Sequence, residues 1–189
     1  MYSGKGLLVV VSGPSGSGKD TVVKCLINKH PEIRISVSFT TRAMRPHEQE
    51  GVDYYFLTME RFNKLLADGE ILEYTEYSGN YYGTPRSEVE KRIDAGETVV
   101  LVIETNGAQN IKKIFPDAMT VFLMPPSIDI LKERLYNRHT ETQEQVTSRL
   151  RIAEKELALA PTYDYCVVND QVEKCADEIF ELINKVKQR

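Results

Sequence analysis

The sequence predicts a three-layer α/β/α fold of the phosphate-loop (P-loop) class, in which helices cover both faces of a five-stranded parallel sheet. Short β-branched runs alternate with helical patterns through most of the chain, and a glycine-rich stretch follows the first of these runs. Strands that alternate with helices form right-handed crossovers and a parallel sheet, whose ligands bind at the carboxyl ends of the strands. We therefore expect the glycine-rich stretch to lie at the ligand-binding edge of the sheet.

The first part of the predicted core combines a strand, a glycine loop and a helix. Residues 7–12 form an apolar, β-branched run that stops at Gly13. Residues 19–28 follow as a helix that ends before Pro31, and residues 33–39 read as the second strand. This order is the one expected at the start of a parallel α/β sheet.

An insertion then interrupts the α/β rhythm. Residues 40–55 contain threonines, arginines, tyrosines and turn formers but no helical period, which is typical of a functional or mobile loop. Thr58 can cap a short helix that ends at Gly69, and residues 71–82 read as a hairpin with a Ser-Gly-Asn turn. The middle of the chain, about residues 34–84, is therefore predicted to be a small β-rich insertion.

After the insertion the alternation of strands and helices returns, with glycine and proline stops between them. The remaining predicted strands are residues 98–103, 119–124 and 165–168, and the remaining predicted helices are residues 85–95, 108–114, 128–136, 143–159 and 172–186. The chain is thus read as one domain, with a core of residues 1–33, 85–135 and 150–189 and a lid at about residues 136–149.

The composition is that of an ordinary globular protein. The 189 residues fit one domain, and 41% hydrophobic with 28% charged residues exclude a disordered or fibrous chain. The net charge of -4 argues against a dedicated nucleic-acid binder, because contacts to phosphate backbones need a basic surface. The apolar run at residues 7–11 is too short for a membrane span, and three cysteines without a CxxC pair indicate free thiols. We expect a cytoplasmic protein that binds neither nucleic acid nor a membrane.

The glycine-rich stretch has the pattern of a phosphate-binding loop. Residues 13–19 read Gly-Pro-Ser-Gly-Ser-Gly-Lys between a buried strand and a helix. Glycines let backbone N–H groups converge on phosphate oxygens, the helix N-terminus adds positive potential, and Lys19 can reach the outer phosphates. Glycine-rich turns are also common structural punctuation, but three glycines and a lysine at this spacing favour phosphate binding.

The position after the lysine departs from the general pattern, which has Ser or Thr there as a Mg²⁺ ligand. Here it is Asp20, followed by Thr21. Asp20 either simply favours a helix N-terminus or contacts Mg²⁺, directly or through water, because a carboxylate is a good ligand for a hard cation. We expect Asp20 or Thr21 to be the metal ligand.

Further motifs decide between the kinds of phosphate-loop protein. The chain lacks the Asn-Lys-x-Asp segment with which GTPases read guanine. The motifs that it carries, in order, are Ser-Val-Ser-Phe-Thr-Thr-Arg at 36–42, Arg-Pro at 45–46, Gly-Val-Asp-Tyr-Tyr-Phe at 51–56, Gly-Asn-Tyr-Tyr-Gly-Thr at 79–84, Glu104 with Asn-Gly-Ala at 106–108, Pro-Pro-Ser at 125–127, Arg-Leu at 134–135, Arg138 with Thr-Glu-Thr at 140–142, Arg-Leu at 149–150 and Val-Asn-Asp at 168–170. Together they closely resemble the motifs of guanylate kinases over nearly the whole chain.

This resemblance implies a magnesium-dependent kinase of purine nucleotide metabolism, which transfers the terminal phosphate of ATP to GMP or dGMP. The implied ATP-binding residues are Gly13, Pro14, Ser15, Gly16, Ser17, Gly18, Lys19, Asp20, Thr21 and Asn169. The implied GMP-binding residues, mostly in the insertion, are Ser38, Arg42, Arg45, Tyr54, Glu73, Tyr82, Thr84 and Glu104. The implied catalytic residues are Lys19, Arg42, Arg134, Arg138 and Arg149.

The residue types agree with these implied roles. Guanidinium groups match the geometry of phosphate, and carboxylates can accept the N1–H and exocyclic N–H donors of guanine. Alternatives remain open from the residues alone. Glu73 could lie on a solvated face, Glu104 could only cap the next helix, the three later arginines could be helix-surface charges, and Asn169 could touch adenine or merely form a turn.

Two other functions compete with phosphoryl transfer to GMP. A guanylate-kinase-like module that has lost catalysis would bind protein partners, but Lys19 and the full arginine set argue against it. A kinase of the same fold for another phosphorylated acceptor would not need the guanine-reading residues.

Val102 stands where family members usually carry an acidic residue, which departs from the family pattern. The oligomeric state does not follow from the sequence.

Overall fold

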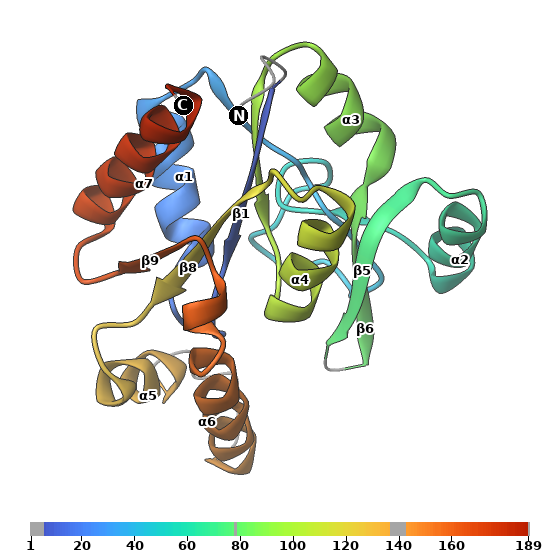
Figure 1. Cartoon of the computed structure of the whole chain (residues 1–189). Coiled ribbons are helices and arrows are strands. Elements are labelled where there is room, and N and C mark those ends of the chain that lie inside the picture. Colours follow the sequence, from blue (N-terminus) through green and yellow to red (C-terminus); the bar gives the residue numbers. More distant parts are fainter. Residues whose placement is uncertain (1–5, 78, 137–142, 189) are drawn as a thin grey trace.

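The computed structural model describes residues 6–77, 79–136 and 143–188. Its centre is a five-stranded sheet in which every neighbouring pair is parallel, as predicted (Figure 1). In spatial order the strands are β2 (Ile33–Ile35), β7 (Thr98–Val102), β1 (Leu7–Ser12), β8 (Met119–Met124) and β9 (Tyr165–Val168). The predicted bounds of β1, β8 and β9 are confirmed.

Helices cover both faces of this sheet. Figure 1 shows α1 (Lys19–Lys29) and α7 (Val172–Lys187) side by side over one face, and α3 (Arg86–Asp94) and α4 (Thr105–Ile114) over the other. Successive residues of β1 point to opposite faces: Val9 packs with the first pair of helices and Val10 with the second. An apolar run without alternation is what a strand buried on both faces requires.

The middle of the chain forms a second sheet of four strands, next to the carboxyl edge of the first. In spatial order its strands are β4 (Tyr55–Phe56), β3 (Phe39–Thr40), β6 (Asn80–Pro85) and β5 (Ile71–Tyr77). The helix α2 (Met59–Ala67) precedes β5, and the Thr58 hydroxyl caps it by accepting from the Arg61 N–H at 3.2 Å. Phe62 of α2 is fully buried.

Two further helices, α5 (Ile128–Tyr136) and α6 (Gln143–Leu157), pack against each other below the central sheet in Figure 1. A short 3₁₀ helix (Ala160–Thr162) leads from α6 to β9. Residues 137–142 of the predicted lid, which is about residues 136–149, lie outside the described residues. The division into core, insertion and lid stays a prediction.

One predicted strand is wrong. Residues 33–39 were expected to form a single strand, but they divide into β2 and β3, which belong to different sheets. Ser36 still donates its N–H to the Val100 carbonyl at 3.0 Å, whereas the Ser38 carbonyl accepts from Tyr55 in the second sheet at 2.9 Å. The chain changes sheets between these serines, and strand propensity carries no signal for such a change.

Candidate active site

The glycine loop joins β1 to α1 with a backbone that only glycine fits. Gly18 has a φ of 92°, and a Cβ there would lie 2.3 Å from Nδ2 of Asn169. At Gly13, with a φ of 144°, a Cβ would lie 2.3 Å from the Leu123 carbonyl oxygen of β8. The loop is thus fixed by close approach to the ends of β8 and β9.

The lysine of the loop is buried and held in place. Nζ of Lys19 donates to the carbonyl oxygens of Gly13 at 2.7 Å and Pro14 at 3.3 Å. It also lies 3.9 Å from Oε1 of Glu104. These contacts keep the ammonium group over the loop whose N–H groups form the predicted phosphate cradle.

Two polar side chains brace the loop from the other side. Asn169 is buried, and its Nδ2 donates to the Ser17 carbonyl at 2.8 Å. Arg134 of α5 donates to the same carbonyl at 3.4 Å and to the Asn169 carbonyl at 3.1 Å. Neither residue lines the cavity described next, and neither is a plain surface group. Arg138 lies outside the described residues.

A cavity of about 200 Å³ lies between the glycine loop and the second sheet. Its walls come from the loop and the start of α1, from the second sheet, from the end of β7 and from α6. The lining residues are Ser15, Gly16, Gly18, Lys19, Asp20, Thr21, Ser38, Arg42, Arg45, Tyr54, Glu73, Thr75, Tyr77, Tyr82, Gly83, Val102, Ile103, Glu104 and Arg149. The structure therefore brings together most residues of the two predicted nucleotide sites, which lie far apart in the sequence.

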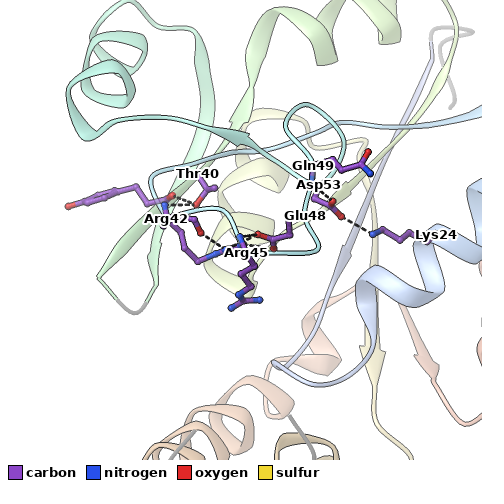
Figure 2. A network of polar contacts seen from close by, with 9 residues as sticks. Lys24, Thr40, Arg42, Arg45, Glu48, Gln49 and Asp53 are labelled. Carbon is purple, nitrogen blue, oxygen red and sulfur yellow. Dashed lines mark hydrogen bonds and ion pairs between the residues drawn. The ribbon is translucent and has the colours of Figure 1, made fainter. Parts of the chain in front are cut away.

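Arginines dominate one end of the cavity. The Arg42 guanidinium forms a bidentate pair with Glu48, with distances of 2.9 Å (Nη1 to Oε2) and 2.7 Å (Nη2 to Oε1) (Figure 2). Oε2 of Glu48 also accepts from the Arg45 N–H at 2.8 Å. The pKa of Glu48 is lowered and that of Arg42 raised by this pair. Glu48 cannot be singled out from the sequence, because an acidic residue in a polar turn has no distinguishing pattern.

The loop that carries Arg42 and Arg45 is linked to helix α1, which covers the central sheet. Nζ of Lys24 on α1 contacts Oδ1 of Asp53 at 2.8 Å, and Oδ2 of Asp53 accepts from the Gln49 N–H at 3.0 Å (Figure 2). Asp53 thus links α1 to the loop that carries both arginines.

Two tyrosines face the arginines. The rings of Tyr54 and Tyr82 meet edge to face, with centroids 5.9 Å apart, and the Arg42 guanidinium lies 5.4 Å from the Tyr54 ring centroid. Burial raises the pKa of Tyr54 above its usual range. Its phenol therefore stays a neutral hydrogen-bond donor.

A buried carboxyl group also lines the cavity on the side of the second sheet. Glu73 on β5 is only 7% exposed, and its Oε1 accepts from the Thr84 hydroxyl of β6 at 2.7 Å. Burial raises the pKa of Glu73 to about 7, and the Thr84 hydrogen bond opposes that rise. The alternative of a solvated Glu73 is wrong. Thr84 does not line the cavity and instead positions this carboxyl group.

A pair of carboxyl groups lies beside the glycine loop. Glu104 precedes α4 but makes no capping hydrogen bond with its side chain, so the alternative that it only caps the helix is wrong. Glu156 of α6 accepts from the Thr105 hydroxyl at 3.4 Å. Burial, with a smaller contribution from the Glu104 charge, raises the pKa of Glu156 to about 7. Glu156 was also missed, because glutamate is ordinary on a helix.

The oxygen donors in the cavity suit a magnesium ion. Asp20 and Thr21 line it at the start of α1, and Asp20 is exposed. In the part of the chain that the structure describes, no three His, Cys, Asp or Glu side chains converge as a ready metal cage. Mg²⁺ is usually held by one or two carboxylates together with substrate phosphates and water, so this sparse set fits it.

The three cysteines, all described, are free thiols. Over residues 6–77, 79–136 and 143–188, no helix is both long and apolar enough to cross a membrane.

Comparison with known proteins gives one consistent family. The family model described as "Guanylate kinase" matches residues 5–186. The curated guanylate kinase of Oceanobacillus iheyensis is 46% identical over 183 residues, which are 97% of this chain and 89% of the relative. That of Streptomyces coelicolor is 49% identical over 179 residues, which are 95% of this chain and 91% of the relative.

Solved structures give the same family at the level of the fold. The crystal structure of guanylate kinase from Anaplasma phagocytophilum superposes with a TM-score of 0.83 at 35% identity, covering 98% of this chain and 88% of that one. A shikimate kinase from Acinetobacter baumannii has a TM-score of 0.52 at 16% identity, covering 97% of this chain and 96% of that one. The second similarity concerns the fold alone.

Proposed function

The chain belongs to the guanylate kinase family and transfers a phosphoryl group from ATP to GMP, and on this premise we propose which of its residues carry the reaction. The observation that carries the proposal is the shared cavity. The glycine loop with Lys19 forms one wall, and Arg42, Arg45 and Glu73 of the second sheet and its loop form the other. Donor and acceptor phosphates held on these walls meet between them.

The donor phosphates bind to the glycine loop. Backbone N–H groups of residues 13–19 and the N-terminus of α1 attract the phosphate oxygens, and Lys19 exchanges its two carbonyl contacts for them. Arg134 and Asn169 act by bracing the loop, and we assign to Asn169 a second role in contacting adenine. Arg149, on the cavity wall, adds positive charge where the transferred group carries its negative charge.

The acceptor binds to the second sheet. Arg42 and Arg45 with the phenols of Tyr54 and Tyr82 hold the GMP phosphate, because guanidinium forks and neutral hydroxyls both donate to it. Glu73 accepts from the guanine N–H donors, with Ser38, Thr84 and Glu104 completing the base site. Adenine presents no such pair of donors, so the same contacts favour GMP and dGMP over AMP.

The chemical step needs positioning and charge more than a reactive side chain. Phosphoryl transfer requires in-line placement of donor and acceptor and cations around the moving group. Exclusion of water is also required, since water would compete with GMP. We assign that exclusion to closure of the predicted lid, about residues 136–149, and of the insertion, about residues 34–84, over the core.

Asp20 or Thr21 would hold Mg²⁺, directly or through water. When bound, the ion neutralises phosphate charge and fixes the donor geometry. Replacing Asp20→Asn is expected to shift the magnesium dependence of the rate to higher concentrations. An unchanged dependence would remove Asp20 from the metal site.

A cytoplasmic location in purine nucleotide metabolism fits this activity, because ATP and GMP are the substrates and the thiols are free. Neither nucleic acid nor a membrane is proposed as a partner.

Two variants test the assignment of the walls. Lys19→Ala is expected to lower kcat by roughly a hundredfold or more, because it removes the cation nearest the transferred phosphate.

Arg42→Lys is expected to raise KM for GMP at least roughly tenfold while KM for ATP stays unchanged, because lysine cannot form a bidentate contact with phosphate. Steady-state kinetics measure both. A change of KM for ATP alone in Arg42→Lys would contradict the assignment.

A further inference from the structure

The Glu73 carboxyl group has a neighbour on the face away from Thr84. Its Oε1 is bonded to Thr84, and its Oε2 points toward the first turns of α4, next to Gly107. A Cβ built on Gly107 would lie 2.6 Å from Oε2 and 3.1 Å from Cδ of Glu73. Real Cβ atoms do not approach other atoms so closely, so the carboxyl group occupies space that only glycine leaves open.

The backbone does not explain a glycine at this position. Gly107 is the third residue of α4, and it is not among the glycines with positive φ. In a helix glycine is less favourable than alanine, because it loses more backbone freedom on folding. The residue is therefore unfavourable for its own helix, and the contact with Glu73 supplies the reason for it.

We propose that Gly107 is a positioning residue for base recognition, and that it sets the place of the Glu73 carboxyl group by leaving room for it against α4. This inference rests on the proposed role of Glu73 as the acceptor for guanine. Thr84 fixes one carboxyl oxygen and the surface of α4 limits the other. Together they aim the group at the pair of N–H donors on the guanine edge.

A substitution with alanine separates this role from a structural one. The atoms that a Cβ meets first belong to the end of the Glu73 side chain, which can move, rather than to backbone. Gly107→Ala is therefore expected to keep the fold, with a melting temperature equal to or above that of the wild type, because alanine favours the helix. The displaced carboxyl group should recognise guanine less well.

The kinetic prediction is specific to the base. In Gly107→Ala, KM for GMP should rise roughly tenfold or more, while KM for ATP stays within about twofold, because a misplaced charged acceptor loses its hydrogen bonds. IMP lacks the exocyclic amino group of guanine, so the preference for GMP over IMP in kcat/KM should fall at the same time. The matched control is Asn106→Ala, an exposed position in the same turn of α4. It should leave all three quantities unchanged.

A double-mutant cycle with Glu73→Gln completes the test. If Gly107 acts through Glu73, adding Gly107→Ala to Glu73→Gln should change KM for GMP by less than about twofold, because coupled residues are not additive. Equal effects of Gly107→Ala in both backgrounds, or an unchanged KM for GMP in a folded Gly107→Ala protein, would overturn the proposal. An unchanged KM for GMP in Glu73→Gln alone would instead overturn the role of Glu73.

Discussion

Burial gives Glu73 the properties that its proposed role in base recognition needs. Among the described residues, the Thr84 hydroxyl is the one hydrogen-bond partner of its carboxyl group, and burial raises its pKa to about 7. Holding a charge there costs free energy, which in the proposed complex is offset when guanine supplies two N–H donors. We therefore expect this contact to discriminate strongly between bases, since a base without such donors would leave the carboxyl group unsatisfied.

This raised pKa predicts a pH dependence of acceptor use. In the proposed complex the ionised form of Glu73 accepts both donors of guanine, and below about pH 7 a growing share of the free enzyme carries Glu73 neutral. We expect kcat/KM for GMP to fall by up to roughly tenfold per pH unit below that point. The measurement is a pH profile from 5.5 to 8.5, corrected with Glu73→Gln for ionisation of the GMP phosphate. Parallel profiles for both proteins would contradict this role.

The sequence identifies the candidate ligand-binding residues better than the residues that hold them in position. Lys19, Arg42 and Glu73 follow from motif and family resemblance, and the structure places all three in one cavity. Glu48 has no such signal, and Gly107, although it lies in the Asn-Gly-Ala motif, has none that names its partner. The partners are 6 and 34 positions away, and only the folded chain brings them together. Contacts between turns of different elements are absent from any local pattern.

At the scale of elements, the glycine loop depends on the ends of two strands. It approaches β8 at Gly13 and is bonded to Asn169 after β9, through the Ser17 carbonyl at 2.8 Å. The loop is thus held by tertiary contacts as well as by its own glycines. We therefore expect the proposed ATP site to be sensitive to changes near the C-terminal end of the sequence.

Replacing Asn169→Ala should expose this dependence. The Ser17 carbonyl loses its shorter hydrogen bond and keeps the longer one from Arg134, so the free energy of unfolding should fall by about 1 kcal/mol. KM for ATP should rise, whereas KM for GMP should stay unchanged, because the second sheet is untouched. Urea unfolding and steady-state kinetics measure the two effects. Full stability with normal use of ATP would show that the loop needs no brace.

The elements also mark where prediction from sequence stops. Buried β1 and β8 were predicted with their bounds, because apolar runs with glycine or proline stops are strong local signals. The segment from β2 to β3 is predicted as one strand, but the chain changes sheets between Ser36 and Ser38. That change depends on hydrogen-bond partners that are distant in sequence, in β7 and at Tyr55. Whether a strand continues or ends at such a point is decided by its pairing with strands that are distant in the sequence.

The whole molecule places two carboxyl groups in poorly solvated sites at the junction of its parts. Glu73 faces α4 from the second sheet, and Glu156 of α6 lies beside the glycine loop and Glu104. Burial raises both pKa values to about 7, above the ordinary value of 4.5. A raised carboxyl pKa means that the unfolded chain releases its proton first as pH rises, so folding stability falls between pH 4.5 and 7.

Glu156→Gln should remove part of this loss. At pH 8 we expect the unfolding free energy of the variant to exceed that of the wild type by about 1–2 kcal/mol, a figure reduced for partial solvent screening. At pH 4.5 the difference should nearly vanish, because the wild-type group is then largely neutral in the folded state. Urea unfolding at both pH values measures it. The sign would be contradicted if the difference in unfolding free energy, variant minus wild type, were smaller at pH 8 than at pH 4.5.

The most direct test of the account is the acceptor preference of the whole enzyme. ADP production by the purified protein with ATP and Mg²⁺ is measured with GMP, dGMP, AMP, UMP and CMP, and Lys19→Ala serves as the control. We expect turnover with GMP and dGMP, little with the other three, and loss of turnover in the control. Comparable turnover with AMP, or none with any nucleotide, would contradict it.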